Sequence, residues 1–214
     1  GVLTEIHPQS VSMVALDGYR LAVSTEKMNS GQENHFIISA KIINEISKII
    51  AEDGDAEEVE IYLGKKKATF RIDTTEIVLR LMEGEYIKYR DIMPTQSTTD
   101  IVIGRAILQE SIERASLLAR EGKNNLIKMI IKNNLLTITS RSEEGNVKEE
   151  IIMEKEGEDL EIGFNSKFVI DVLKVIDDDE ISMHFLTGTS PCMVKPVSGD
   201  AYEYLILPVR IPTI

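Results

Sequence analysis

Apolar residues recur at helical spacing in two segments of the chain that resemble each other. Residues 38–50 and 164–176 carry the same pattern around two lysines, at a constant offset of 126 residues (164 minus 38). The spacing predicts one amphipathic helix in each segment, with Ser39 and Asn165 in the N-cap positions. A repeat of this length is about the size of a domain, so the chain is predicted to hold two copies of one fold. The apolar stripes are Ile42, Ile43, Ile46, Ile49 and Ile50 in the first helix and Phe168, Val169, Val172, Val175 and Ile176 in the second.

Alternation of apolar and polar residues predicts strands on both sides of each helix. Asn133-Asn134 predicts a hairpin turn in the second copy. Pro208 lies within the last apolar segment, and proline in a strand indicates an edge position. The predicted strands are 2–6, 11–15, 59–63, 68–72 and 77–81 in the first copy and 127–131, 135–139, 181–185 and 204–209 in the second.

A polar stretch, Thr95 to Asp100, follows Pro94 and predicts the linker between the copies, so the expected domains are 1–94 and 95–214. The second copy then opens with a predicted helix over residues 104–121, which has no counterpart in the first copy. Its apolar residues are Ile107, Ile112, Ala115 and Leu118. Either the first copy has lost this helix or the chain is the C-terminal part of a longer protein, and we favour the second interpretation.

The composition of the 214 residues narrows the function. Hydrophobic residues make up 43%, no run of 18 apolar residues occurs, and the first residues do not read as a signal peptide. Cys192 is the single cysteine, which suits a reducing cytoplasm. The net charge of −12 argues against a simple nucleic-acid binder, although it leaves room for a locally basic surface.

Candidate chemical motifs are weak. His7, His35 and His184 have no metal-ligand spacing with one another or with Cys192. Residues 177–180 lack the alternating ligands of a calcium loop, and residues 64–67 lack the spacing of a phosphate-binding loop. No serine or cysteine lies in a nucleophile motif. We therefore expect no catalytic site, no metal and no cofactor.

Two further segments are informative together. Asp17-Gly18 is a turn signal followed by an aromatic residue and an arginine, and by itself it reads as a hairpin turn. Residues 204–211 by themselves read as a terminal core strand. In combination, Asp17-Gly18-Tyr19-Arg20-Leu21-Ala22 and Leu207-Pro208-Val209-Arg210 resemble motifs of the beta subunit of bacterial DNA polymerase III, the sliding clamp. Residues 81–89 and 162–165 resemble the same family.

This resemblance implies an α+β fold of duplicated DNA-clamp domains, each with antiparallel sheets outside and amphipathic helices on the inner face. Residues 1–94 would be the middle domain without its opening helix, and residues 95–214 the C-terminal domain. The implied function is that of a processivity factor, not an enzyme. It would encircle duplex DNA without sequence preference and tether the replicative polymerase, the clamp loader and other clamp-binding peptides.

In the family, partner peptides bind an apolar pocket, and rings form from head-to-tail homodimers. Carried over to this sequence, the pocket residues are Leu16, Gly18, Tyr19, Arg20, Leu21, Ile87, Ile92, Asn165, Phe168, Ser190, Cys192, Leu205, Ile206, Leu207, Pro208, Val209 and Arg210. The DNA-facing residues are Lys41, Lys48, Arg114, Arg120, Lys167 and Lys174, and the dimer contact falls on Leu117 and Leu118. The lysines of each pair lie seven residues apart and therefore on one helical face.

Some residues depart from the family pattern. Tyr19 stands where histidine is common, Ile87 where proline is common, and Asp91 where some members carry a basic residue. We expect these changes to alter peptide preference more than the existence of the pocket. The tail 212–214 could partly cover the groove.

Two other classes of function stay open from the sequence. One is a hydrolase-like enzyme on a duplicated α+β scaffold, which would need a polar cleft with convergent titratable groups. The other is a clamp-like structural protein without a DNA role. Without a first domain, we expect this chain to be a monomer or to form non-native contacts, and we expect a cytoplasmic location with no membrane partner.

Overall fold

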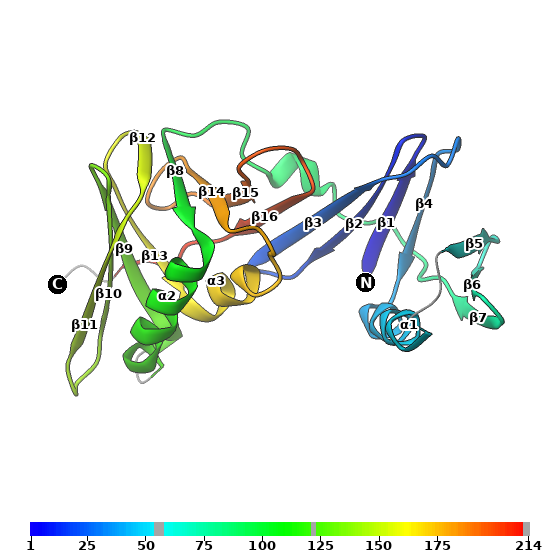
Figure 1. Cartoon of the computed structure of the whole chain (residues 1–214), viewed down its shortest axis with the longest axis horizontal. Helices are drawn as coiled ribbons and strands as arrows, with labels where there is room; N and C mark the ends of the chain where they lie inside the picture. Colours follow the sequence, from blue (N-terminus) through cyan, green and yellow to red (C-terminus); the bar gives the residue numbers. More distant parts are fainter. Residues whose placement is uncertain (54–57, 121–122, 212–214) are drawn as a thin grey trace. The chain divides into compact units, whose positions relative to one another are not determined.

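The computed structural model describes residues 1–53, 58–120 and 123–211, and the chain packs as two units (Figure 1). Unit 1 comprises Gly1–Leu16 and Val23–Lys88, and unit 2 comprises Asp17–Ala22 and Tyr89–Ile214. The expected domain boundary between Pro94 and Thr95 stays a prediction, and limited proteolysis would locate the susceptible linker. No helix of the described residues is long and apolar enough to cross a membrane.

Unit 1 contains an antiparallel sheet in the order β3-β2-β1-β4. These strands are β1 (Val2–His7), β2 (Ser10–Leu16), β3 (Arg20–Lys27), whose first three residues belong to unit 2, and β4 (Asn34–Ile38). The register pairs Leu3 with Val14 and with Ile37, so alternate side chains of β1 and β2 reach the same face.

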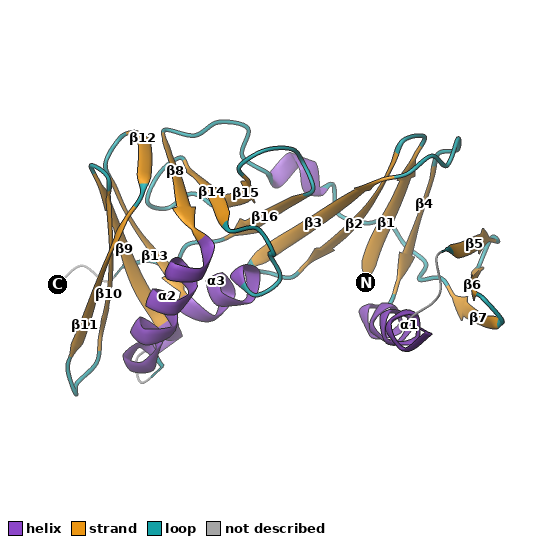
Figure 2. Cartoon of the chain, in the orientation of Figure 1, coloured by secondary structure: helices purple, strands orange, loops and turns teal. Residues whose placement is uncertain are grey.

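Helix α1 (Ala40–Asp53) joins β4 to a three-stranded antiparallel sheet of β5 (Val59–Leu63), β6 (Lys67–Ile72) and β7 (Thr75–Arg80) (Figure 2). Ile46 is buried, and the other four isoleucines of the predicted stripe pack against the same core. That core also contains Phe36 and Ile38 of β4 and Phe70 and Ile72 of β6. The predicted helix and its apolar face are therefore confirmed.

Unit 2 contains two antiparallel groups of strands (Figure 1). The first group runs in the order β12 (Glu154–Gly157), β8 (Thr99–Gly104), β14 (Glu180–Phe185), β15 (Cys192–Pro196) and β16 (Tyr202–Ile206). The second runs in the order β11 (Asn146–Ile152), β10 (Leu135–Arg141), β9 (Leu126–Lys132) and β13 (Leu160–Asn165). The β9–β10 hairpin turns at Asn133, whose φ of 50° lies in the left-handed region that asparagine tolerates, as the sequence predicted.

Helices α2 (Arg105–Ala119) and α3 (Ser166–Leu173) contribute to the main core of unit 2 (Figure 2). The short 3₁₀ helices are η1 (Tyr89–Ile92) and η2 (Lys123–Asn125). Asn165 caps α3, because its side-chain oxygen accepts a hydrogen bond from the backbone N–H of Lys167 at 3.0 Å. This confirms the predicted cap.

Three predictions about elements of unit 2 were wrong in detail. Thr99 and Asp100 are not part of a linker but begin β8, where Thr99 is fully buried. Helix α2 begins at Arg105 and ends at Ala119, so it is shorter than the expected 104–121, and residue 121 lies outside the described residues. Val175 lies beyond the end of α3 and is exposed, whereas Ile170 and Leu173 of the helix are buried.

The end of the strand expected over residues 204–209 was also wrong, because β16 ends at Ile206. Pro208 therefore does not mark an edge strand. The backbone N–H of Leu207, directly after β16, donates to the carbonyl of Tyr19 at 2.9 Å. Pro208 lies after the end of β16, so its missing N–H removes no hydrogen bond from the pairing of that strand.

Candidate functional site

A tight turn presents the first motif at the surface of unit 2. The Asp17 carboxylate accepts hydrogen bonds from the backbone N–H groups of Tyr19 at 2.8 Å and Arg20 at 3.0 Å, and the backbone N–H of Asp17 donates to the Arg20 carbonyl. Such a side chain replaces backbone partners in a turn. Tyr19 is left 61% exposed. Burial of the carboxylate opposes its ionisation, but these hydrogen bonds outweigh that effect and hold the Asp17 pKa below its usual value.

The Arg20 guanidinium lies in a cluster of charged and aromatic side chains. Its Nε donates to Asp17 at 3.1 Å and its Nη1 to Asp171 of α3 at 2.6 Å. The guanidinium carbon is 4.8 Å from the centroid of the Phe168 ring, and the Tyr19 ring stacks on Phe168 at 5.5 Å. The hydrogen bond that Arg20 donates to Asp171 is the main reason that the Arg20 pKa is raised. The cluster fixes the position of the Arg20 guanidinium.

Helix α3 supplies the opposite side of this cluster. Phe168 and Asp171 lie three residues apart and therefore on one face of the helix. The cap at Asn165 fixes where the helix starts. Sequence reasoning missed Asp171, although its spacing from Phe168 on a predicted helix was a usable signal.

The C-terminal segment continues past β16 and runs along β13. The backbone N–H of Val209 donates to the carbonyl of Gly163 at 2.8 Å. A Cβ at Gly163 would lie only 2.6 Å from the Val209 carbonyl oxygen, so this close approach requires glycine. Leu207 is 36% exposed, whereas Leu205 and Ile206 are buried in β16. The chain thus leaves the core between Ile206 and Leu207, and the last motif lies at or near the surface.

The other predicted pocket residues occupy different environments. Leu21 and Cys192 are buried, and burial raises the pKa of the Cys192 thiol. Ser190 is half-buried, and its hydroxyl lies 2.7 Å from that of Thr187. Ile92 is exposed in η1. The remaining ones are placed as follows: Gly18 and Arg210 are exposed, Pro208 and Val209 are half-buried, and Leu16 (half-buried) and Ile87 (exposed) belong to unit 1. The tail 212–214 lies outside the described residues.

The six residues expected to face DNA are all exposed, but they differ in their partners. Lys48 pairs with Glu45 at 2.9 Å, and Lys174 lies 3.9 Å from Glu113. The Arg114 guanidinium bonds Glu149 at 2.7 Å, which raises the arginine pKa. Within the described part of the chain, no ion pair involves Lys41, Lys167 or Arg120. Of the two residues of the expected dimer contact, Leu117 is exposed and Leu118 is half-buried.

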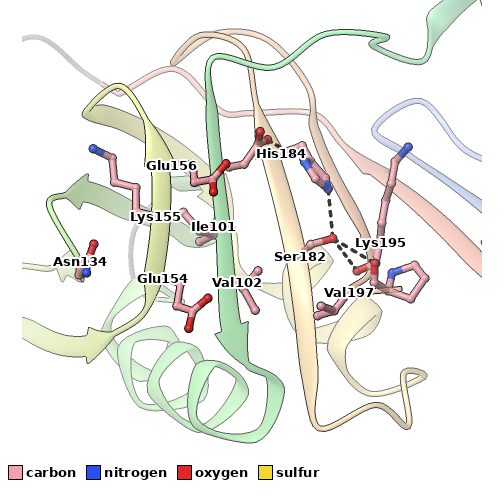
Figure 3. A pocket seen from close by; sticks show the side chains of 12 residues that line it. Ile101, Val102, Asn134, Glu154, Lys155, Glu156, Ser182, His184, Lys195 and Val197 are labelled. Atoms are coloured by element: carbon pink, nitrogen blue, oxygen red, sulfur yellow. Dashed lines mark hydrogen bonds and ion pairs between the residues drawn. The ribbon is translucent and has the colours of Figure 1, made fainter. Parts of the chain in front are cut away.

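Unit 2 also contains a polar cleft of about 540 Å³ that the sequence did not predict (Figure 3). Nδ1 of His184 lies 2.7 Å from Asp100, and Nε2 lies 3.1 Å from the Ser182 hydroxyl. Glu154 and Glu156 of β12 point toward β8. A smaller cavity of about 130 Å³ shares His184 and Lys195. This is the kind of cleft that the enzyme alternative requires.

The hydrogen bonds in the cleft do not activate the serine. The Ser182 hydroxyl donates to the backbone carbonyls of Lys195 at 3.1 Å and Pro196 at 3.2 Å. Carbonyl oxygens only accept, so both compete with the histidine nitrogen for the single hydroxyl proton that a nucleophilic serine would have to give up to that nitrogen. Ser182 is also buried. Within the described residues, no group of three or more His, Cys, Asp or Glu is arranged to hold a metal ion.

Comparisons with known proteins match both halves of the chain to the same family. Residues 1–88 match the family model described as the DNA polymerase III beta subunit, central domain, and residues 90–210 match its C-terminal domain. The "Beta sliding clamp" of Staphylococcus epidermidis is 37% identical over 213 residues, and that of Staphylococcus aureus is 35% identical. These alignments cover 98% of this chain and 56% of each relative, so the chain spans about half the length of the curated relatives that it matches.

Solved structures show the same similarity. The DNA polymerase III beta subunit from Thermotoga maritima superposes with a TM-score of 0.92 at 33% identity, covering 99% of this chain and 57% of that one. The DNA polymerase sliding clamp from Bacillus subtilis gives a TM-score of 0.92 at 32% identity, with the same coverage.

Proposed function

Because this chain belongs to the family of DNA polymerase III beta subunits, the sliding clamps, we propose that it supplies two domains of a DNA-encircling processivity factor. Both family matches occur in order and together span nearly all of the chain. The factor would have no catalytic site of its own and would act in the cytoplasm. Its role would be to tether a replicative polymerase and other partners to duplex DNA.

The partner site is proposed at the Tyr19–Phe168–Arg20 cluster and the adjoining C-terminal segment. The observation that carries this proposal is the 2.9 Å bond from the Leu207 N–H to the Tyr19 carbonyl, which holds the two sequence motifs together. Tyr19 and Leu207 expose apolar surface beside a fixed arginine. An apolar surface with a few polar anchors suits a short peptide that carries Leu and Phe side chains.

Peptide titration tests this site directly. A fluorescent Gln-x-x-Leu-Phe peptide should bind the wild-type chain, and Leu207→Asp should abolish binding because the carboxylate would be desolvated against the peptide's apolar side chains. Leu135→Asp is a matched control, since Leu135 of β10 has the same 36% exposure but lies in the other sheet. If the wild type shows no affinity at high micromolar peptide, or if both variants bind equally well, the proposed site is wrong.

The DNA contact is proposed for the exposed cations of α1, α2 and α3. Lys41 and Lys48 share one face of α1, and Lys167 of α3 shares its face with Lys174, the residue directly after that helix. Contacts of this kind bind phosphates without sequence preference and weaken as salt rises. Replacing Lys41 and Lys167 with glutamate should lower the affinity for duplex DNA of any sequence. An unchanged affinity at low salt would exclude these two residues from the contact.

Assembly is a separate part of the proposal. We propose that the full-length protein forms a homodimeric ring and that Leu117 and Leu118 of α2 lie in its contact. Light scattering of the 214-residue chain should give the mass of a monomer. A symmetric dimer that loads onto DNA would refute this assignment.

The enzyme alternative is testable at the polar cleft. Ser182, His184 and Asp100 are adjacent, so an esterase substrate such as p-nitrophenyl acetate is a fair probe. Turnover by the wild type that disappears in Ser182→Ala would support a hydrolase. We expect no difference between the two, because two backbone carbonyls compete with His184 for the serine proton.

A further inference from the structure

The Arg20 guanidinium has one positive charge, and the two carboxylates that contact it have two negative charges. Asp17 and Asp171 both bond its guanidinium, so two carboxylates surround one cation. The Nη1–Asp171 distance of 2.6 Å is short, as expected of a charge-assisted hydrogen bond. The Arg20 and Asp171 side chains are 32% and 40% exposed, so the pair lies where an incoming peptide can reach it.

The two carboxylates differ in the groups that they bond. Asp17 uses Oδ1 to hold the backbone of its own turn and Oδ2 to reach Arg20. For Asp171, the partner recorded among the described residues is Arg20, which lies 151 positions away in the sequence. The local turn therefore does not need Asp171, whereas the orientation of the Arg20 guanidinium depends on it.

We infer that Asp171 is a specificity-determining residue of the partner site, because it withholds the Arg20 guanidinium from a partner's carboxylate. This inference rests on the proposed function. A peptide that carries an acidic residue beside its apolar anchors gains no ion pair with Arg20 while Asp171 occupies it. Selection then depends on the apolar side chains that pack near Phe168 and Leu207.

Asp171→Asn isolates this effect. Asparagine has the same shape and can still accept a hydrogen bond from Arg20, but it carries no charge. Asp17 still pairs with Nε of Arg20, but the hydrogen bond at Nη1 loses its charge assistance, so a peptide carboxylate can compete for that side of the guanidinium, and the repulsion from Asp171 disappears. An exposed ion pair is worth up to about 1 kcal/mol, so the acidic peptide should gain about fivefold in affinity relative to the neutral one.

The probes are the pentapeptide Gln-Ser-Ser-Leu-Phe and two versions in which one serine is replaced by aspartate. The measured quantity is the ratio of the acidic to the neutral dissociation constant, within each protein variant. A general loss of folding cancels in this ratio. Asp159→Asn is a matched control: Asp159 is also paired at 2.6 Å, with Lys155, and is 49% exposed.

In Asp171→Asn, at least one acidic peptide should gain about fivefold over the neutral one at low salt, and the gain should shrink as salt rises. Asp159→Asn should leave the ratios at their wild-type values. If Asp171→Asn leaves them unchanged, or if Asp159→Asn shifts them equally, the inference is wrong while the partner site stands. If the neutral peptide fails to bind the wild type, the proposed function fails first.

Discussion

Replacing Gly163 with alanine is predicted to push the C-terminal segment away from β13. A Cβ at this position would lie 2.6 Å from the Val209 carbonyl oxygen and 3.0 Å from side-chain carbons of both Ile211 and Leu126. Gly163 does not have a positive φ, so alanine fits the backbone conformation. The effect is therefore one of space alone.

The size of the effect follows from which atoms can move. The carbons of Ile211 and Leu126 belong to flexible side chains and can turn aside, whereas the Val209 oxygen belongs to the backbone. That oxygen must move from 2.6 Å to at least 3.4 Å, and the Val209–Gly163 hydrogen bond of 2.8 Å is disturbed with it. Adding a methyl group to a packed site costs about 1–3 kcal/mol of unfolding free energy.

Urea denaturation and peptide titration together measure this prediction. Gly163→Ala should lose about 1–3 kcal/mol and should also bind the Gln-x-x-Leu-Phe peptide more weakly, because Leu207 belongs to the displaced segment. Gly18→Ala is the control, since a Cβ at Gly18 meets nothing within 4 Å although the residue lies in the same proposed site. If Gly163→Ala matches the wild type within about 0.5 kcal/mol and binds peptide equally well, the steric reasoning is refuted.

Three further predictions concern stability and reactivity. Ile112→Ala should lower the unfolding free energy measured by urea denaturation by about 2–5 kcal/mol, because Ile112 is fully buried. Ile107→Ala on the same helix should lower it far less, because Ile107 is 50% exposed. Equal losses would contradict the observed buried face of the helix. The buried Cys192 thiol, whose pKa is raised by burial, should resist alkylation by iodoacetamide until the protein unfolds, and rapid labelling of folded protein would show that it is accessible. Burial also raises the pKa of Tyr204, so the unfolded chain loses the protons of the Cys192 thiol and the Tyr204 hydroxyl at lower pH than the folded chain does. The contribution of these two groups to the unfolding free energy should therefore be steady below about pH 8.5 and fall above it. A rise of the unfolding free energy above that pH would contradict the assignment.

Local patterns were sufficient for the parts of the fold that depend on near neighbours. The isoleucine stripe of α1, the cap at Asn165 and the hairpin at Asn133 each involve residues within a few positions of one another. The four-residue strand β12 has the sequence Glu-Lys-Glu-Gly and shows no apolar periodicity. It is a strand because it pairs with β8. A pattern within one segment contains no information about such a partner.

The candidate site shows the same limit. The turn at Asp17-Gly18 and the aromatic residue after it could be found from sequence, and the resemblance added the C-terminal motif. The helical spacing from Phe168 could have placed Asp171 on the same face, but its bond to Arg20 could not be predicted, because it joins residues 151 positions apart. The exposure of Leu207 beside the buried Ile206 depends on where β16 ends, and Pro208 suggested a different ending.

The charges on the proposed DNA-facing helices favour a weak contact over a tight one. Lys48, Lys174 and Arg114 each have a carboxylate within 4 Å, so their attraction for phosphates is partly cancelled. A protein that neutralised many phosphates would bind tightly and lose affinity steeply with salt. A ring that must move along DNA needs the opposite, because each tight contact would have to break at every step. Partial pairing of these cations, on a chain with a net charge of −12, is therefore compatible with the sliding role proposed for the family's fold.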